Sequence, residues 1–177
     1  MPPDQHGRSN RFEIERPTPD RSRLTVGIAD LALTAEGQTL TTSGLGSCVA
    51  VTLHDDVASV AGLLHAMLPR ASDGTDDNPV KYVDAGVERL YERAVAAGAS
   101  GRRLEAKLAG GSHMFDFGDA DERIGARNVA VARETLERLG VSLVGEDVGG
   151  DSGRSVRFDP GTGTLTVRKA GTAIRRI

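Results

Sequence analysis

The regular pattern of hydrophobic and polar residues begins after residue 21. Leu24, Val26 and Ile28 alternate with polar or small residues, and this spacing predicts a half-buried strand. The segment GQTLTT that follows predicts a second, short strand that leads into the glycine-rich stretch GLGS. The apolar runs CVAVTL and SVAGLLHAML are joined by HDDVA, an arrangement that predicts a β-hairpin.

Two later segments follow the period of a helix. Apolar residues recur at three- and four-residue spacing in residues 80–97 and 122–139, and each segment is followed by a glycine, so both are predicted to be amphipathic helices. Four more strands are predicted from RLEAKLAGG, VSLVGEDVGG, RSVRFD and GTLTVRK, the last two joined by the turn PGTG. Because strands outnumber helices, the sequence predicts an α+β domain with mixed sheets and two principal helices that cover one side.

The two ends of the pattern suggest how the chain is divided. Residues 1–21 contain four of the seven prolines and almost no periodic hydrophobic signal, so they are predicted to be a disordered tail. Residues 22–177 are predicted to form a single domain, because the chain is 38% hydrophobic and 27% charged, as globular chains are. The tail lacks the apolar core of a signal peptide, and no run of about 18 apolar residues follows it. We therefore expect a cytoplasmic protein with no membrane insertion.

Composition also narrows the class of partner. Aromatic residues make up 3% of the chain, tryptophan is absent, and the formal net charge is −3. Proteins that bind nucleic acid use basic stripes and aromatic residues that stack on bases, and neither stands out in this sequence. We therefore expect no nucleic-acid partner.

The candidate chemistry centres on the only cysteine, Cys48, which follows the glycine-rich turn. Of the four histidines, only His65 falls within a predicted strand, where an imidazole needs a polar partner. If Leu53 and Val60 are the last paired residues of the hairpin, Cys48 lies opposite His65. A single cysteine also cannot form an internal disulfide, which leaves its thiol available for reaction.

A thiol and an imidazole at this spacing suit nucleophilic acyl transfer. The imidazolium lowers the pKa of a neighbouring thiol, and such pairs usually need a third group that orients the ring. Residues 41–43, of sequence Thr-Thr-Ser, arrive on the adjacent segment and can supply that group. Backbone amides around Gly46, Ser47 and Cys48 are candidates for an oxyanion hole.

Other interpretations of the same residues remain open at this point. A lone cysteine is most often a small buried hydrophobic residue, and a lone histidine in a strand is often a core residue with a satisfied hydrogen bond. The glycines can serve only as a tight turn, since no lysine and hydroxyl residue follow them as in a phosphate-binding loop. A zinc site built from Cys48, His65 and His113 lacks the usual spacing of ligands.

An ordered set of motifs resembles the CheD family of chemoreceptor glutamine deamidases. These are TTSGLGSCVAVTLHD, GLLHAMLP, KYVDAGVERL, AKLAGGSHMF, IGARN and GEDVGGDSGRSVRFDPGTG, which run in order within residues 26–167. The resemblance implies that Cys48 is the nucleophile, that His65 transfers protons and that Thr42 orients the imidazole. It also implies an α/β sandwich similar to that of deamidating toxins of the cytotoxic necrotizing factor type. No metal or organic cofactor is implied.

The resemblance further implies the partners. Members of the family act on the cytoplasmic helices of methyl-accepting chemotaxis receptors, and many bind the phosphatase CheC. A second hypothesis is therefore a binding module that serves mainly as a partner of CheC or of receptor arrays. A third is a cysteine hydrolase of small amides. Hydrolysis of methyl esters would use the same acyl-enzyme and stays open.

Overall fold

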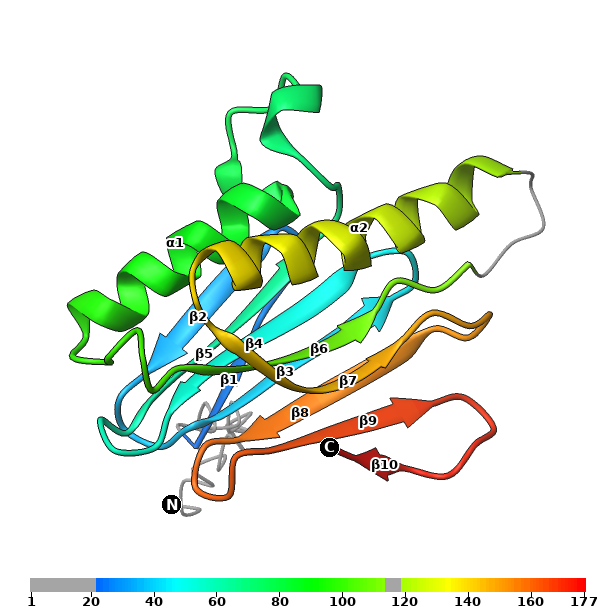
Figure 1. Ribbon diagram of the computed structural model, residues 1–177. Coiled ribbons are helices and arrows are strands. Elements are labelled where there is room, and N and C mark those ends of the chain that lie inside the picture. Colours follow the sequence, from blue (N-terminus) through cyan, green and yellow to red (C-terminus); the bar gives the residue numbers. More distant parts are fainter. Residues whose placement is uncertain (1–21, 114–118) are drawn as a thin grey trace, which may run out of the picture.

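A computed structural model describes residues 22–113 and 119–177. These residues form two five-stranded sheets, and two helices lie on one side of them (Figure 1). Sheet A has the strand order β1-β3-β8-β9-β10, and sheet B has the order β2-β5-β4-β6-β7. The strands of sheet A are β1 Arg23–Thr25, β3 Thr39–Leu45, β8 Arg154–Asp159, β9 Thr164–Lys169 and β10 Arg175–Arg176. Those of sheet B are β2 Asp30–Thr34, β4 Val49–Asp55, β5 Val60–Ala66, β6 Glu105–Gly110 and β7 Ser142–Val148.

Both sheets are mixed, as the sequence predicts. One parallel pair occurs in each, β1 with β3 and β6 with β7, and the other neighbouring strands are antiparallel. Two helices, α1 Val83–Ala96 and α2 Asp119–Arg138, confirm the two predicted helical segments. Two short 3₁₀ turns, η1 Ala71–Asp73 and η2 Pro79–Lys81, precede α1. The α+β fold class is therefore confirmed, whereas residues 1–21, predicted to be a disordered tail, lie outside the described residues.

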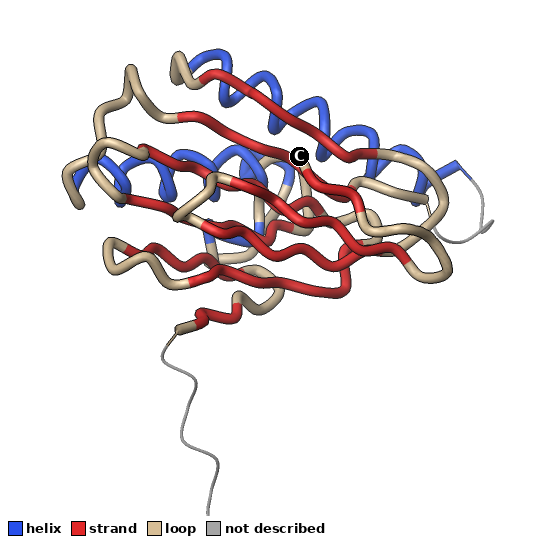
Figure 2. Tube along the Cα trace, turned by 90° about the horizontal axis from the view of Figure 1, so that it is seen from below, coloured by secondary structure: helices blue, strands red, loops and turns tan. Residues whose placement is uncertain are grey.

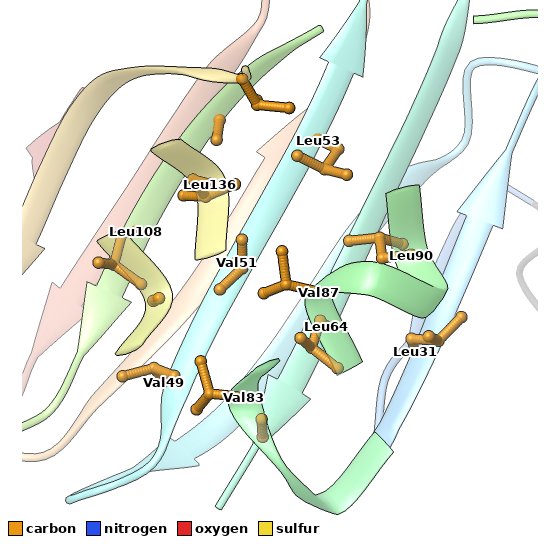
Figure 3. Packing of buried hydrophobic residues seen from close by; sticks show 14 of the residues in the cluster. Leu31, Val49, Val51, Leu53, Leu64, Val83, Val87, Leu90, Leu108 and Leu136 are labelled. Carbon is orange, nitrogen blue, oxygen red and sulfur yellow. The ribbon is translucent and has the colours of Figure 1, made fainter. Parts of the chain in front are cut away.

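The helices, sheet B and sheet A form three layers, and apolar side chains fill the space between each layer and the next. Helices α1 and α2 cover the outer face of sheet B, where Leu53, Leu64, Leu90 and Leu136 belong to one buried cluster (Figure 3). A second cluster fills the space between the two sheets. The helices lie on the opposite side of the molecule from sheet A (Figures 1 and 2).

Strand β4 shows why its sequence is apolar on both faces. Val49, Val51 and Leu53 point into the cluster beneath the helices, while Ala50 belongs to the cluster between the sheets. A strand covered on both sides loses the usual alternation of apolar and polar residues. The same holds for β5, in which all seven residues are buried. A polar side chain in either strand must therefore find a partner inside the protein.

The first predicted strand differs from the structure. The pattern of Leu24, Val26 and Ile28 predicts one continuous strand, but β1 ends at Thr25 and Ile28 is 58% exposed. The chain crosses there from sheet A to sheet B, and Ala29 takes a positive φ of 54° just before β2 begins. Only Val26 remains buried, because its amide still donates to the carbonyl of Thr41 on β3.

The predicted hairpin register is wrong by two residues. The last pair is Asp55 with Val60, so His65 lies opposite Ala50 and not opposite Cys48. Asp55 extends the strand because its carboxylate is fully buried and accepts hydrogen bonds from Arg103 and from the amide of Ala58 within the turn. A buried carboxylate is stable only with such partners, and the distant arginine could not be inferred from the HDDVA segment alone.

Candidate active site

The site lies where three strands meet at one end of the space between the sheets. Thr42 belongs to β3 of sheet A, His65 belongs to β5 of sheet B, and Cys48 lies in the connection from β3 to β4. The side chain of Cys48 packs against the cluster between the sheets. Thr42 and His65 are 3% and 0% exposed, while Cys48 is only partly buried. Among these three residues, only Cys48 is therefore partly open to solvent.

A chain of hydrogen bonds determines which nitrogen of His65 carries the proton. The Thr42 hydroxyl oxygen lies 2.8 Å from His65 Nδ1 and 2.8 Å from the carbonyl oxygen of Val26. A carbonyl can only accept, so the hydroxyl donates its single proton to Val26 and accepts the Nδ1–H of the imidazole. His65 therefore presents Nε2 with a free lone pair. Nε2 is buried and has no hydrogen-bond partner among the described residues.

Cys48 and His65 share a face of sheet B despite the error in register. Val49 pairs with Ala66, so continuing the ladder by one residue places Cys48 beside Met67. Positions two residues apart on a strand point to the same face, and diagonal neighbours on an antiparallel ladder lie about 7–8 Å apart, within reach of side chains. A shift of two residues thus keeps the thiol and the imidazole on one side, in a diagonal relation.

Burial determines the resting charge of the pair. It raises the pKa of the Cys48 thiol, against a smaller lowering effect of the hydrogen bond from its own backbone amide. Burial also lowers the pKa of His65. Both effects favour neutral groups, whereas the sequence interpretation expected the imidazole to lower the pKa of the thiol. The arrangement suits an imidazole that accepts the proton as the sulfur attacks, rather than a preformed ion pair.

Two backbone carbonyls of the connection before β4 are tied to the segment after β6. The carbonyl of Gly46 accepts from both the amide and the hydroxyl of Ser112, at 2.9 and 3.0 Å. The carbonyl of Cys48 accepts from the amide of Gly111 at 2.8 Å. Gly111 has a φ of +64°, and an added Cβ would lie 2.4 Å from Val129 and 2.9 Å from a backbone oxygen of α2, so only glycine fits there.

The third carbonyl of this connection is held by a helix. Asn128 on α2 is completely buried, and its side-chain Nδ2 donates to the carbonyls of Ser47 and Met67, both at 2.9 Å. Met67 follows β5, which carries His65, and Ser47 precedes the cysteine. One amide group therefore ties the segment that carries the thiol to the strand that carries the imidazole.

With these carbonyls held, the amides that follow them point in defined directions. In a trans peptide the N–H points opposite to the preceding carbonyl, so anchoring Gly46 and Ser47 orients the amides of Ser47 and Cys48. Neither amide donates to another backbone carbonyl among the described residues, and the Cys48 amide is directed at its own thiol, whereas the amide of Gly46 donates to the carbonyl of Gly44 at 3.2 Å. Ser47 and Cys48 are therefore the candidate oxyanion donors, and Gly46 contributes its anchored carbonyl.

Sequence reasoning missed Ser112 and Asn128 as parts of the site. Asn128 did carry a signal, because it lies four residues after Ile124 on the buried face of a helix, where a polar residue needs a partner. His113, named above as a candidate zinc ligand, is exposed while His65 is fully buried. No group of three or more potential metal ligands occurs among the residues searched, which are those that the structure describes. None of the described helices is long and apolar enough to span a membrane.

Comparison with known proteins identifies relatives over most of the chain. A protein 48% identical over 158 residues, from Haloarcula marismortui, is named probable chemoreceptor glutamine deamidase CheD; the match covers 89% of this chain and 90% of that protein. The equivalent protein of Pyrococcus horikoshii bears the same name and is 47% identical over 158 residues, covering 87% of this chain and 98% of its own.

Solved structures show a fainter likeness. Bacillus licheniformis hypothetical protein YfiH matches with a TM-score of 0.44 and 14% identity, over 67% of this chain and 50% of its own. Neisseria meningitidis protein NMB0706 matches with a TM-score of 0.43 and 14% identity, over 72% of this chain and 62% of its own.

The model of the CheD family, described as CheD chemotactic sensory transduction, matches residues 67–169. The chain thus belongs to the CheD family, as its sequence motifs predict.

Proposed function

We propose that this protein is a cysteine-dependent protein-glutamine deamidase that converts glutamine side chains of chemotaxis receptors to glutamate. The observation that carries the proposal is the oriented imidazole: Thr42 accepts the Nδ1–H of His65, which leaves Nε2 free on the sheet face that also carries Cys48. The names of the relatives support glutamine as the substrate side chain and chemoreceptors as the substrate proteins. A receptor substrate of this kind would place the reaction in the cytoplasm.

The first half of the reaction transfers the acyl group to sulfur. Cys48 Sγ attacks the Cδ of the substrate glutamine while His65 Nε2 accepts the thiol proton. The negative charge that develops on the amide oxygen is stabilised by the amides of Ser47 and Cys48. As the carbonyl re-forms, the C–N bond breaks, and Nε2 returns its proton to the departing ammonia. The product of this half is a thioester.

The second half releases the product. His65 Nε2 accepts a proton from water, whose oxygen attacks the thioester carbon. The C–S bond then breaks, the thiolate of Cys48 regains a proton from Nε2, and glutamate leaves. Through both halves Thr42 accepts the Nδ1–H and holds the ring, and the buried carbonyl of Val26 fixes the Thr42 hydroxyl. Apart from the attacking water, each step uses only side chains and amides of this chain, so the proposed mechanism requires no metal or organic cofactor.

Mass spectrometry of a receptor cytoplasmic fragment tests the proposal. Incubation with the wild type should add about one mass unit at specific glutamines, the change expected when an amide becomes an acid, and Cys48→Ala should add none. Cys48→Ser is a matched control that keeps the size of the side chain and replaces the sulfur. Equal mass gain with wild type and Cys48→Ala would contradict the assignment of the nucleophile. Absence of any gain, together with firm binding to the receptor or to CheC, would favour the binding-module hypothesis.

A further inference from the structure

The outer face of sheet A has a charge opposite to that of the whole chain. Side chains alternate along these strands: Val156 and Phe158 of β8 point inward and are buried, while Arg157 between them is exposed. By the same alternation four arginines point outward, one from each of four strands. We call this surface of sheet A the basic face. The arginines are Arg23, Arg157, Arg168 and Arg176.

The basic face is concentrated and has little internal neutralisation. Asp159 is the only acidic residue that points outward from the described strands of sheet A, so four arginines and one aspartate give a local charge of +3, against −3 for the chain. None of the four arginines forms an ion pair within the described part of the chain. By contrast, arginines on the helical side such as Arg133 and Arg138 are paired with glutamates.

Hydroxyl groups fill the positions between the arginines. The strand register aligns Thr25, Thr41, Arg157, Thr166 and Arg176 in one row across all five strands. Guanidinium and hydroxyl groups both donate to carboxylate oxygens, and no apolar side chain lies in this row. Such a surface suits an acidic partner bound through charge and hydrogen bonds rather than through an apolar contact.

The basic face is continuous with the segment that leads to Cys48. A hollow of about 270 Å³ is lined by Arg157, Arg168 and residues 41–43. A second hollow of about 870 Å³ shares Ser155 and Arg168 with the first and extends to Gly44 and Leu45, three residues before the cysteine. Gly44 lies at the irregularity between β3 and β8, and no atom lies within 4 Å of the position that a Cβ would occupy. A surface that covers both hollows therefore reaches the end of β3, directly before the connection that carries the thiol.

We propose that the basic face docks an acidic surface of the substrate protein while the reacting glutamine occupies the site at Cys48. The inference rests on the proposed deamidase function, since it takes the receptor as the occupant. Charge complementarity raises the rate of encounter and sets the orientation of docked proteins. Arg168 lines both hollows, and Arg157 lines the first from β8, the central strand of sheet A, so these two arginines are expected to be the principal contacts.

Binding of a labelled receptor cytoplasmic fragment to the full chain carrying Cys48→Ala tests the docking apart from the chemistry. Reversing two charges with R157E/R168E should weaken binding about tenfold, since each exposed pair contributes up to about 1 kcal/mol. The matched control is R89E/R93E, which makes the same change of charge at two exposed arginines of α1 and should leave binding within about twofold. Binding of the receptor fragment to the protein without charge reversals should also weaken as the salt concentration rises.

The outcomes separate docking from catalysis. Equal binding of the two charge-reversed variants, or no binding of the fragment at all, would overturn the docking. Binding that falls only in R157E/R168E supports it, whether or not the wild type deamidates the fragment. Deamidation by the wild type at a rate that both variants retain would overturn the docking and leave the deamidase function intact. A duplex DNA or an anionic vesicle that binds through these arginines while the receptor does not would also overturn it. In the Cys48-containing proteins, equal rates of alkylation by iodoacetamide show that the reversals leave the site intact.

Discussion

Asn128 offers the sharpest test of how the site is assembled, because its side chain hydrogen-bonds to the backbone on either side of the site and to neither the thiol nor the imidazole. Its side-chain amide donates to the carbonyls of Ser47 and Met67, and its own Oδ1 is buried without a partner among the described residues. The two donated hydrogen bonds are therefore the feature that the asparagine supplies at this position.

Asn128→Ala removes both hydrogen bonds and leaves two carbonyls without their donor. Each of the two carbonyls left unsatisfied costs about 1–3 kcal/mol, and removal of the unsatisfied Oδ1 offsets part of that cost, so the free energy of unfolding should fall by about 2–4 kcal/mol in total. A domain of this size is stable by about 5–15 kcal/mol and should remain folded. Displacement of the Ser47–Cys48 peptide by about 1 Å should lower kcat/KM for receptor deamidation by about a hundredfold. Asn128→Asp should lower both the free energy of unfolding and kcat/KM at least as much, since a carboxylate would face the two carbonyls.

The control for this experiment lies on the same helix. Thr135 is 2% exposed, and its hydroxyl donates only to the carbonyl of Val131 within α2. Thr135→Val removes a buried hydrogen bond and should lower stability by about 1 kcal/mol with no change in kcat/KM. Unfolding by urea gives the stabilities, and deamidation of the receptor fragment gives the rates. If Asn128→Ala loses the expected stability but keeps kcat/KM within about twofold, the residue is structural and the positioning argument fails.

Three further predictions follow from the same contacts. Thr42→Val removes the acceptor of the His65 Nδ1–H. The value of kcat/KM should fall by about ten- to a hundredfold, because a hydrogen bond to a charged imidazolium contributes that much. An unchanged kcat/KM in steady-state kinetics would contradict the role of Thr42. His65 must be neutral to accept the thiol proton, and burial lowers its pKa. The acid limb of the pH profile of kcat/KM should therefore lie below about pH 6.5. A limb above about pH 7.5 would exclude His65 as the base. Asp55→Asn should destabilise the chain by about 2–4 kcal/mol at pH 7. Arg103 and two backbone amides hold the pKa of this carboxyl far below its usual range, so wild type and variant should converge in urea unfolding as the pH falls below about 4.

Local patterns predicted the secondary structure better than they predicted the connections. The helical period of α1 and α2 and the turn PGTG depend on residues close in sequence, and these elements are confirmed. The break after Thr25 depends instead on which sheet each strand joins. Val26 is buried in sheet A and Leu31 in sheet B, and periodicity alone cannot tell one continuous strand from two strands in different sheets. The basic face could not be predicted from the sequence for a related reason, since its arginines come from four strands and form no run along the chain.

The pairing of Cys48 with His65 shows which errors a site prediction can tolerate. Strand side chains repeat every two residues, so a register error of one would have placed the thiol and the imidazole on opposite faces, whereas the actual error of two did not. The sequence could therefore indicate, from a wrong register, two side chains that do lie on the same face. It could not indicate which groups Asn128 and Ser112 bind, because their partners are backbone carbonyls some 60 to 80 positions away and a carbonyl carries no sequence signal. The candidate catalytic side chains of this protein are visible in the sequence, while the hydrogen bonds that hold the neighbouring backbone in place become visible only in the fold.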